Sequence, residues 1–146
     1  MSELFTIVME ESPARQDTDF VREQLAQFNL LYSPPDNHQT LTLFLRAPSG
    51  GIVGGLLADT FWGWLHIDIF WIAEKCRGQG YGDQLLKMAE QEAVTRGCRR
   101  SHLETHSFQS LVFYQKRGYS IFAELADFPP GHVKYFLKKD LSSKEV

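Results

Sequence analysis

A glycine-rich run at residues 77–82, Arg-Gly-Gln-Gly-Tyr-Gly, constrains the fold of this chain more than any other feature. A strand-like run with alternating side chains, residues 64–72, precedes it, and residues 83–96 follow it with apolar residues at helical spacing. A strand, a glycine loop and a helix in this order direct free backbone N–H groups and the positive end of a helix dipole at an anion. Glycine also lets the backbone approach that anion closely. The sequence therefore predicts a cradle for a pyrophosphate.

The spacing of the glycines separates three kinds of phosphate-binding loop. A nucleotide P-loop needs Gly-x-x-x-x-Gly-Lys-Ser/Thr, and no Lys-Ser or Lys-Thr follows these glycines. A dinucleotide fingerprint needs Gly-x-Gly-x-x-Gly, whereas Gly78, Gly80 and Gly82 are spaced two by two. The pattern Arg/Gln-x-x-Gly-x-Gly/Ala fits. Together with the preceding strand, it resembles the acetyl-CoA-binding motif of the GNAT superfamily of N-acetyltransferases.

A second segment strengthens the resemblance. Residues 102–105 are typical of a short strand, residues 110–117 of a short helix closed by Gly118, and residues 119–125 of another strand. A helix that ends in Phe-Tyr-x-Lys-x-Gly-Tyr before a strand resembles the second GNAT motif, in which the helix lines the pantetheine arm of the cofactor. The resemblance covers about residues 41–140 and implies acetyl-CoA as the co-substrate, without a metal.

The remaining elements follow from apolar periodicity and from chain breakers. We expect a first strand at residues 4–9, a helix capped by Asp17 or Thr18, a break at residues 33–37, a hairpin of strands 41–47 and 52–60, and a last strand at residues 132–139. The resulting order, β-α-β-β-β-α-β-α-β-β, predicts an α+β fold with a GNAT-like mixed, mostly antiparallel central sheet flanked by helices. The resemblance implies that the strand before the glycine loop and the strand at 102–105 are parallel and splay apart around the cofactor.

Length and composition predict one domain and exclude several classes of partner. A chain of 146 residues with 43% hydrophobic content predicts a single domain over residues 1–146, with a frayed tail at residues 142–146. Cys76 and Cys98 lack metal-ligand spacing and suit a reducing compartment. No apolar run approaches the roughly 20 residues of a membrane span, and a net charge of −3 argues against nucleic-acid binding. We expect a cytoplasmic protein, and both a monomer and a homodimer are open.

The resemblance assigns two of the catalytic roles. Tyr114 matches the family's tyrosine that protonates the departing thiolate, and a phenol with a pKa of about 10 is a suitable acid for that step. The alternative for Tyr114 is simple core packing beside Phe113. A backbone N–H of Phe70, Trp71 or Ile72 would polarise the thioester carbonyl.

The general base is open. His66 and Asp68 are predicted to share one face of their strand, and Glu104 and His106 one face of theirs. Histidine has a suitable intrinsic pKa, which a nearby carboxylate would raise. We retain Glu104, His66 and Asp68 as catalytic candidates. The alternatives are a water relay and an ordinary hydrogen-bonding role within the sheet.

The predicted cofactor-binding residues come from the strand end, the glycine loop and the second motif. They are Phe70, Trp71, Ile72, Arg77, Gly78, Gln79, Gly80, Tyr81, Gly82, Asp83, Ser107 and Tyr114. Many GNAT members have an asparagine seven residues before the tyrosine, which bonds the pantetheine arm. Ser107 stands at that position here, and its hydroxyl has a shorter reach.

The predicted acceptor site combines aromatic and acidic residues near loop ends. Tyr32 and Trp64 could enclose a small amine through apolar and cation–π contacts, and Glu124 and Asp127 could attract a cation; core packing is the alternative for the aromatic residues. The expected function is an N-acetyltransferase that moves the acetyl group from acetyl-CoA to a primary amine of a small molecule by direct attack. The alternatives are a non-catalytic acyl-CoA-binding or regulatory domain of the same fold, and a protein N-acetyltransferase.

Overall fold

The structure, a computed structural model, describes residues 3–141. The chain forms two compact units, Met1–Pro35 and Asp36–Val146. The predicted tail at residues 142–146 lies outside the described residues. No helix among the described residues is long and apolar enough to cross a membrane.

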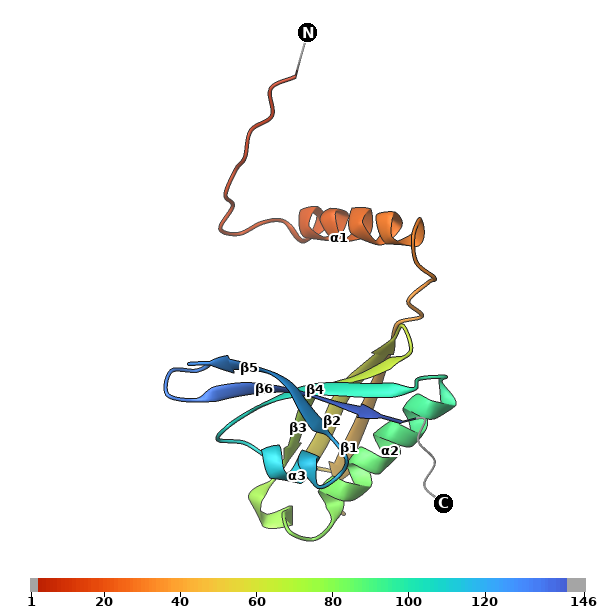
Figure 1. The fold of residues 1–146 in the computed structure, drawn as a ribbon, viewed down its shortest axis with the longest axis vertical. Coiled ribbons are helices and arrows are strands. Elements are labelled where there is room, and N and C mark those ends of the chain that lie inside the picture. The colour runs from red at the N-terminus through yellow and green to blue at the C-terminus, as the bar shows by residue number, and fades with distance from the viewer. Residues whose placement is uncertain (1–2, 142–146) are drawn as a thin grey trace. The chain divides into compact units, whose positions relative to one another are not determined.

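The first unit contains one helix, α1 (Arg15–Leu30), drawn in orange in Figure 1. The strand predicted at residues 4–9 is wrong, because these residues form no strand; a strand needs a neighbour for its backbone hydrogen bonds. The predicted cap is also wrong. The helix begins after Ala14, which provides no side-chain cap, and Thr18 Oγ1 instead donates to the Arg15 carbonyl at 2.9 Å.

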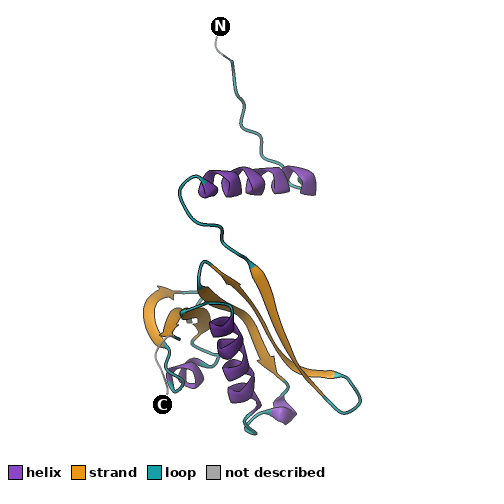
Figure 2. Ribbon diagram, turned by 90° about the vertical axis from the view of Figure 1, so that its right-hand side faces the viewer, coloured by secondary structure: helices purple, strands orange, loops and turns teal. Residues whose placement is uncertain are grey.

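The second unit is built on a six-stranded sheet with the order β1-β2-β3-β4-β6-β5 (Figures 1 and 2). The strands are β1 (Gln39–Arg46), β2 (Ile52–Phe61), β3 (Trp64–Ile72), β4 (Arg100–His106), β5 (Ser120–Ala126) and β6 (Val133–Asp140). All neighbouring pairs are antiparallel except β3 and β4, which are parallel. The predicted mixed, mostly antiparallel sheet is confirmed, although its first predicted strand does not form.

Helix α2 (Tyr81–Thr95) covers one face of the sheet. Its buried residues recur at helical spacing, as predicted from the sequence, and they are Leu85, Leu86, Ala89 and Ala93. They join one apolar core with Leu56 of β2, Leu65 of β3 and Leu103 of β4. Helix α3 (Leu111–Gln115) adds Tyr114 to the same core, so both helices lie on the same face. A short 3₁₀ turn, η1 (Glu74–Cys76), links β3 to the glycine loop.

A β-bulge interrupts the alternation of β3. Leu57 of β2 lies opposite Ile69 and Ala58 lies opposite Ile67, so Asp68 is an extra residue between two regular pairs. Beyond the bulge, the residues that point to the core have even instead of odd numbers: Phe70 packs against the core, and Ile69 is exposed. The alternation predicted for residues 64–72 therefore holds only as far as Ile67.

The parallel pairing of β3 with β4 is short. It runs from Trp64 opposite Arg100 to Ile67 opposite Leu103. Both strands continue, β3 to Ile72 and β4 to His106, without further pairing to each other. The predicted splayed parallel pair is therefore present, and the strands separate next to Asp68 and Glu104.

Candidate active site

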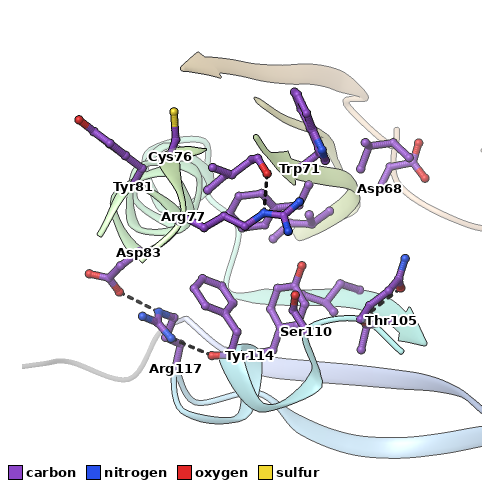
Figure 3. A pocket seen from close by; sticks show the side chains of 18 of the residues that line it. Asp68, Trp71, Cys76, Arg77, Tyr81, Asp83, Thr105, Ser110, Tyr114 and Arg117 are labelled. Atoms are coloured by element: carbon purple, nitrogen blue, oxygen red, sulfur yellow. Dashed lines mark hydrogen bonds and ion pairs between the residues drawn. The ribbon is translucent and has the colours of Figure 1, made fainter. Parts of the chain in front are cut away.

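A cavity of about 860 Å³ opens where β3 and β4 separate (Figure 3). This volume lies in the usual range for small-molecule and cofactor sites. Its walls come from β3, the glycine loop, the start of α2, the end of β4, and α3. The lining residues are Ile67, Asp68, Ile69, Phe70, Trp71, Ile72, Cys76, Arg77, Gly78, Gly80, Tyr81, Gly82, Asp83, Leu103, Glu104, Thr105, Phe108, Gln109, Ser110, Phe113, Tyr114 and Arg117.

The start of α2 provides the anion cradle that the glycine run predicts. Gly80 is the N-cap residue and has a φ of 89°, a left-handed conformation that favours glycine. The first helical hydrogen bond runs from Gln84 N to Gly80 O at 3.1 Å, so the N–H groups of Tyr81, Gly82 and Asp83 precede it. Together with the helix dipole, these groups form a positive end that lines the cavity.

Gly82 serves a different purpose from Gly80. A Cβ atom at Gly82 would lie only 3.2 Å from the Phe113 ring and 3.4 Å from Ile72 Cδ1. The missing side chain lets α2 approach both the end of β3 and α3 closely. The glycine loop thus combines one residue that needs an unusual backbone angle with one that needs space.

Arg117 ties the two helices together across the cavity (Figure 3). Its Nε donates to Asp83 Oδ1 at 2.9 Å, one of its terminal nitrogens donates to the Phe113 carbonyl at 3.0 Å, and its guanidinium lies 3.8 Å from the centre of the Phe113 ring. Lys87 also pairs with Asp83 at 3.1 Å, and the pKa of Asp83 falls below its usual 3.8 because of Lys87 first and Arg117 second. Two cations therefore balance the carboxylate beside the anion cradle.

Arg77 and Gln79 shape the loop itself. Arg77 Nε donates to the Ile72 carbonyl at 2.8 Å and so holds the loop against the end of β3. Gln79 Nε2 donates to the Lys75 carbonyl at 3.1 Å, and its side chain does not line the cavity. Of these two residues, Arg77 lines the cavity and adds the positive charge of its guanidinium to it.

Tyr114 is buried at the cavity wall. Its ring lies 5.3 Å from the Phe113 ring and 6.4 Å from the Phe70 ring, measured between centroids. Burial raises the pKa of Tyr114 to about 12, so its hydroxyl keeps its proton at neutral pH. Tyr114 therefore belongs to the core and also lines the cavity.

Glu104 and His66 form a hydrogen-bonded pair at the point where the strands separate. His66 Nε2 lies 3.1 Å from Glu104 Oε2, and this bond raises the pKa of His66 above 6.5 while burial opposes it. The same bond holds the pKa of Glu104 below 4.5. On its other side, His66 Nδ1 lies 3.8 Å from Asp59 Oδ1. Since Glu104 lines the cavity, the pair links the cavity to a second proton-binding group.

His102 stacks on His66, with ring centroids 4.5 Å apart and an interplanar angle of 25°. Burial, followed by the charge on His66, lowers the pKa of His102 below 6.5. The donor atoms of His66, His102 and Glu104 lie within 4.8 Å of one another, a spacing that could hold a metal ion.

The structure brings together some of the predicted catalytic residues. Asp68 and Glu104 line the cavity, and His66 reaches it through Glu104. His106 is engaged elsewhere, because its Nδ1 lies 2.9 Å from Gln109 Oε1 and its ring stacks on Phe108.

The remaining predicted residues do not line the cavity. Ser107 Oγ lies 3.1 Å from His132 Nδ1 and accepts from the Val133 N–H at 3.1 Å, so it fastens the loop after β4 to the start of β6. Trp64 lies at the far end of β3, with its ring 5.4 Å from the His102 ring. Glu124 and Asp127 are exposed on and after β5, and Tyr32 belongs to the first unit.

Sequence reasoning missed the roles of Arg117, Phe113 and His102. Arg117 and Phe113 lie inside the second motif, but their contacts with Asp83 and Gly82 join segments about 30 residues apart. For His102 a signal existed, since it shares a strand face with Glu104. The parallel register that sets it beside His66 was the missing information.

Comparisons with known proteins agree with this geometry. The family model described as "Acetyltransferase (GNAT) family" matches residues 1–119. The chain is 41% identical over 93 residues to a blasticidin-S acetyltransferase of Streptomyces morookaense, which covers 63% of this chain and 68% of the relative. It is 30% identical over 119 residues to an acetyltransferase of Agrobacterium fabrum, covering 82% of this chain and 87% of the relative.

A solved structure supports the same assignment. The crystal structure of an acetyltransferase from Bacillus cereus matches with a TM-score of 0.83 and 31% identity, over 91% of this chain and 97% of the other. The glycine cradle at the start of α2, the splayed β3–β4 pair and these matches lead to one conclusion: the chain belongs to the GNAT family of acetyltransferases.

Proposed function

We propose that this protein is an acetyl-CoA-dependent N-acetyltransferase that acetylates a primary amine of a small molecule by direct attack. The observation that carries the proposal is the composition of the cavity between β3 and β4. Its wall contains the N–H cradle of α2, the buried and protonated Tyr114, and the ionised Glu104 paired with His66.

The residues around the glycine loop suit the pyrophosphate of CoA. A Cβ atom built at Gly80 would meet only Gln84 Nε2, at 4.0 Å, so there is open space in front of the loop. The N–H groups of residues 79–83 would bind the phosphate oxygens, and Arg77 adds a positive charge. The cofactor supplies an acetyl group activated as a thioester.

The exposed edge of β3 suits polarisation of the acetyl carbonyl. On one side, β3 pairs with β2 as far as Ile72, opposite Gly54. On the other side it pairs with β4 only as far as Ile67. Among the described residues, the edge of β3 from Asp68 to Ile72 thus faces the cavity without a β4 partner, and those of its N–H groups that point away from β2 can donate to an oxygen there.

Two proton transfers complete the reaction. The amine nitrogen forms a bond to the acetyl carbon while the bond from that carbon to sulfur breaks. Tyr114 donates its proton to the departing thiolate. The proton lost by the amine passes to the Glu104–His66 pair, directly or through a water molecule.

A small-molecule acceptor is supported by the surroundings of this pair and by one relative. Asp59, Asp68 and Glu104 place three carboxylates around His66, an environment that favours a cationic amine. The relative from Streptomyces morookaense is named as an acetyltransferase of blasticidin S, which is a small-molecule acceptor.

The function is tested by a thiol-release assay over a panel of amines. The panel contains blasticidin S, other small cationic amines and short peptides with free N-termini, and mass spectrometry identifies the acetylated product. We expect turnover with at least one small amine. CoA binding without turnover of any amine would support the non-catalytic alternative, and turnover of peptides alone would support a protein N-acetyltransferase.

Gly80→Asp should weaken CoA binding by at least ten-fold, about 1.4 kcal/mol, because it places a side chain and a negative charge in the anion cradle. Gly63→Asp is the matched control, since Gly63 also has a positive φ, 77°, and open space around it, but lies in the β2–β3 turn. Calorimetry measures both affinities. An equal loss in the two variants would show that backbone strain, and not the cradle, was responsible.

Tyr114→Phe should lower single-turnover acetyl transfer by roughly 10²–10⁴-fold while CoA affinity stays nearly unchanged, because only the departing thiolate requires the hydroxyl. Tyr119→Phe is a useful comparison. Tyr119 is another buried tyrosine of the same core, but its hydroxyl bonds Glu90 and Ser101 and it does not line the cavity. Wild-type transfer rates in Tyr114→Phe would leave that residue with a packing role only.

The Glu104–His66 pair should stabilise the fold most between about pH 4.5 and 6.5. The raised His66 pKa gives stability that is complete below 6.5 and is lost as the pH rises through the folded pKa; the lowered Glu104 pKa gives stability that is present above 4.5 and is lost as the pH falls. Urea unfolding at several pH values should show the largest cost of Glu104→Gln in this window. A pH-independent cost, equal to that of the exposed control Glu124→Gln, would contradict the pairing.

A further inference from the structure

Four ionisable side chains form a row across the sheet, and the proton transfer described above uses only two of them. His38 Nε2 lies 2.8 Å from Asp59 Oδ2. Asp59 Oδ1 lies 3.8 Å from His66 Nδ1, and His66 Nε2 lies 3.1 Å from Glu104 Oε2. Imidazoles and carboxylates therefore alternate, and we call these four residues the histidine–carboxylate row. Within the row, Glu104 lines the cavity and the other three members do not.

The register of the sheet brings the row together, because each member comes from a different segment of the chain. Asp59 of β2 lies opposite His66 of β3 in their antiparallel pair. His66 in turn lies opposite His102 of β4, and Glu104 follows two residues later on the same strand face. His38 comes directly before β1. All members of the row belong to the second unit.

Asp59 uses a separate oxygen for each of its two histidines. The His38 ring lies at Oδ2, and the His38 N–H donates to Asp36 Oδ1 at 3.2 Å, so the ring that holds Asp59 is itself fastened to the chain before β1. The other oxygen faces His66 Nδ1 at 3.8 Å, a distance at which Asp59 acts through its charge. A carboxylate beside one ring nitrogen favours the tautomer with the proton on that nitrogen.

Charged groups from three strands face His66, and two of them favour different tautomers. The hydrogen bond with Glu104 raises the pKa of His66 most; burial opposes this rise, whereas the charges of Glu104, Asp59 and Asp68 add to it. His102 stacks on the ring at 4.5 Å. Glu104 favours a proton on Nε2, and Asp59 favours a proton on Nδ1. Only the tautomer with the proton on Nδ1 leaves Nε2 able to accept a proton from the cavity side.

We propose that Asp59, which His38 holds in place, is a positioning residue that keeps a proton on His66 Nδ1, so that Nε2 can accept the proton of the acceptor amine through Glu104. The amine loses one proton as it bonds to the acetyl carbon, and Glu104 passes that proton to Nε2. The resulting imidazolium lies between two carboxylates and releases its proton to water after the product leaves, while Asp59 stays ionised. This inference rests on the proposed function and assigns the residue that selects the tautomer of the base.

Asp59→Asn tests the assignment in the full chain. The amide keeps the size of the side chain, removes its charge and can donate to Nδ1, which favours the unproductive tautomer. We expect single-turnover transfer to the amine identified in the panel to fall roughly ten- to a hundred-fold, and the acid limb of the pH–rate profile to move down by about one pH unit. CoA affinity should stay unchanged, because Asp59 does not line the cavity.

Two variants serve as controls for this substitution. Asp59→Glu keeps the charge and should retain most of the transfer rate. Glu92→Gln removes an equal charge from the exposed side of α2, where Glu92 pairs with Arg96 at 2.8 Å, and should leave the rate and the profile unchanged. A wild-type rate and profile in Asp59→Asn, or the same shift in Glu92→Gln, would overturn the proposal.

The tautomer of His66 is measured without catalysis, by nitrogen NMR of the isotope-labelled, ligand-free protein at a pH above the pKa of His66. His66→Gln identifies its signals among the five histidines of the chain. We expect a proton on Nδ1 in the wild type and on Nε2 in Asp59→Asn, and an identical tautomer in both proteins would overturn the proposal. If no amine is acetylated, the proposed function fails, whereas the NMR result still decides whether Asp59 selects the tautomer.

Discussion

The loss of hydrogen bonding between β3 and β4 beyond Ile67 and Leu103 is the constraint on which the rest of the site depends. A sheet can open in this way only if each freed strand is held on its other edge. Here β3 stays paired with β2 as far as Ile72, and β4 stays paired with β6 as far as His106. The opening therefore has two firm walls, and unpaired backbone of β3 faces the space between them.

The chemistry of the cavity follows from what lies at the two ends of this opening. Where the strands part, Glu104 meets His66 across the gap; at the wide end, α2 presents its first N–H groups. Tyr114 lies on the wall between them, in the core. A ligand with an anionic group at one end and a reactive centre at the other would therefore find a suitable partner for each within the same cavity.

Much of the fold could be predicted from the sequence, because its signals are local. The glycine run, the apolar spacing in α2 and the breaks before β6 fix most of the elements to within one or two residues. The strand predicted at residues 4–9 failed because a strand depends on a neighbour, which an apolar run does not reveal.

The parts of the site that sequence reasoning missed depend on register. The bulge at Asp68 reverses the two faces of β3, so that Phe70 joins the core although simple alternation gives it the same face as His66. Ser107 occupies the position of the family asparagine, but it bonds His132 and Val133 across the sheet, residues 25 and 26 positions further along the chain. Such effects arise from the partner strand, and the local sequence does not encode them.

The contact of Arg117 with Asp83 and Phe113 has a consequence for the energetics of ligand capture. Because it joins α2 to α3, this contact holds together two helices that line the cavity before any ligand binds. A ligand that enters a cleft of fixed width does not have to immobilise the chain around it, so less of the contact energy is offset by lost conformational entropy. The backbone of the free protein and that of the ligand-bound protein should then be nearly superimposable.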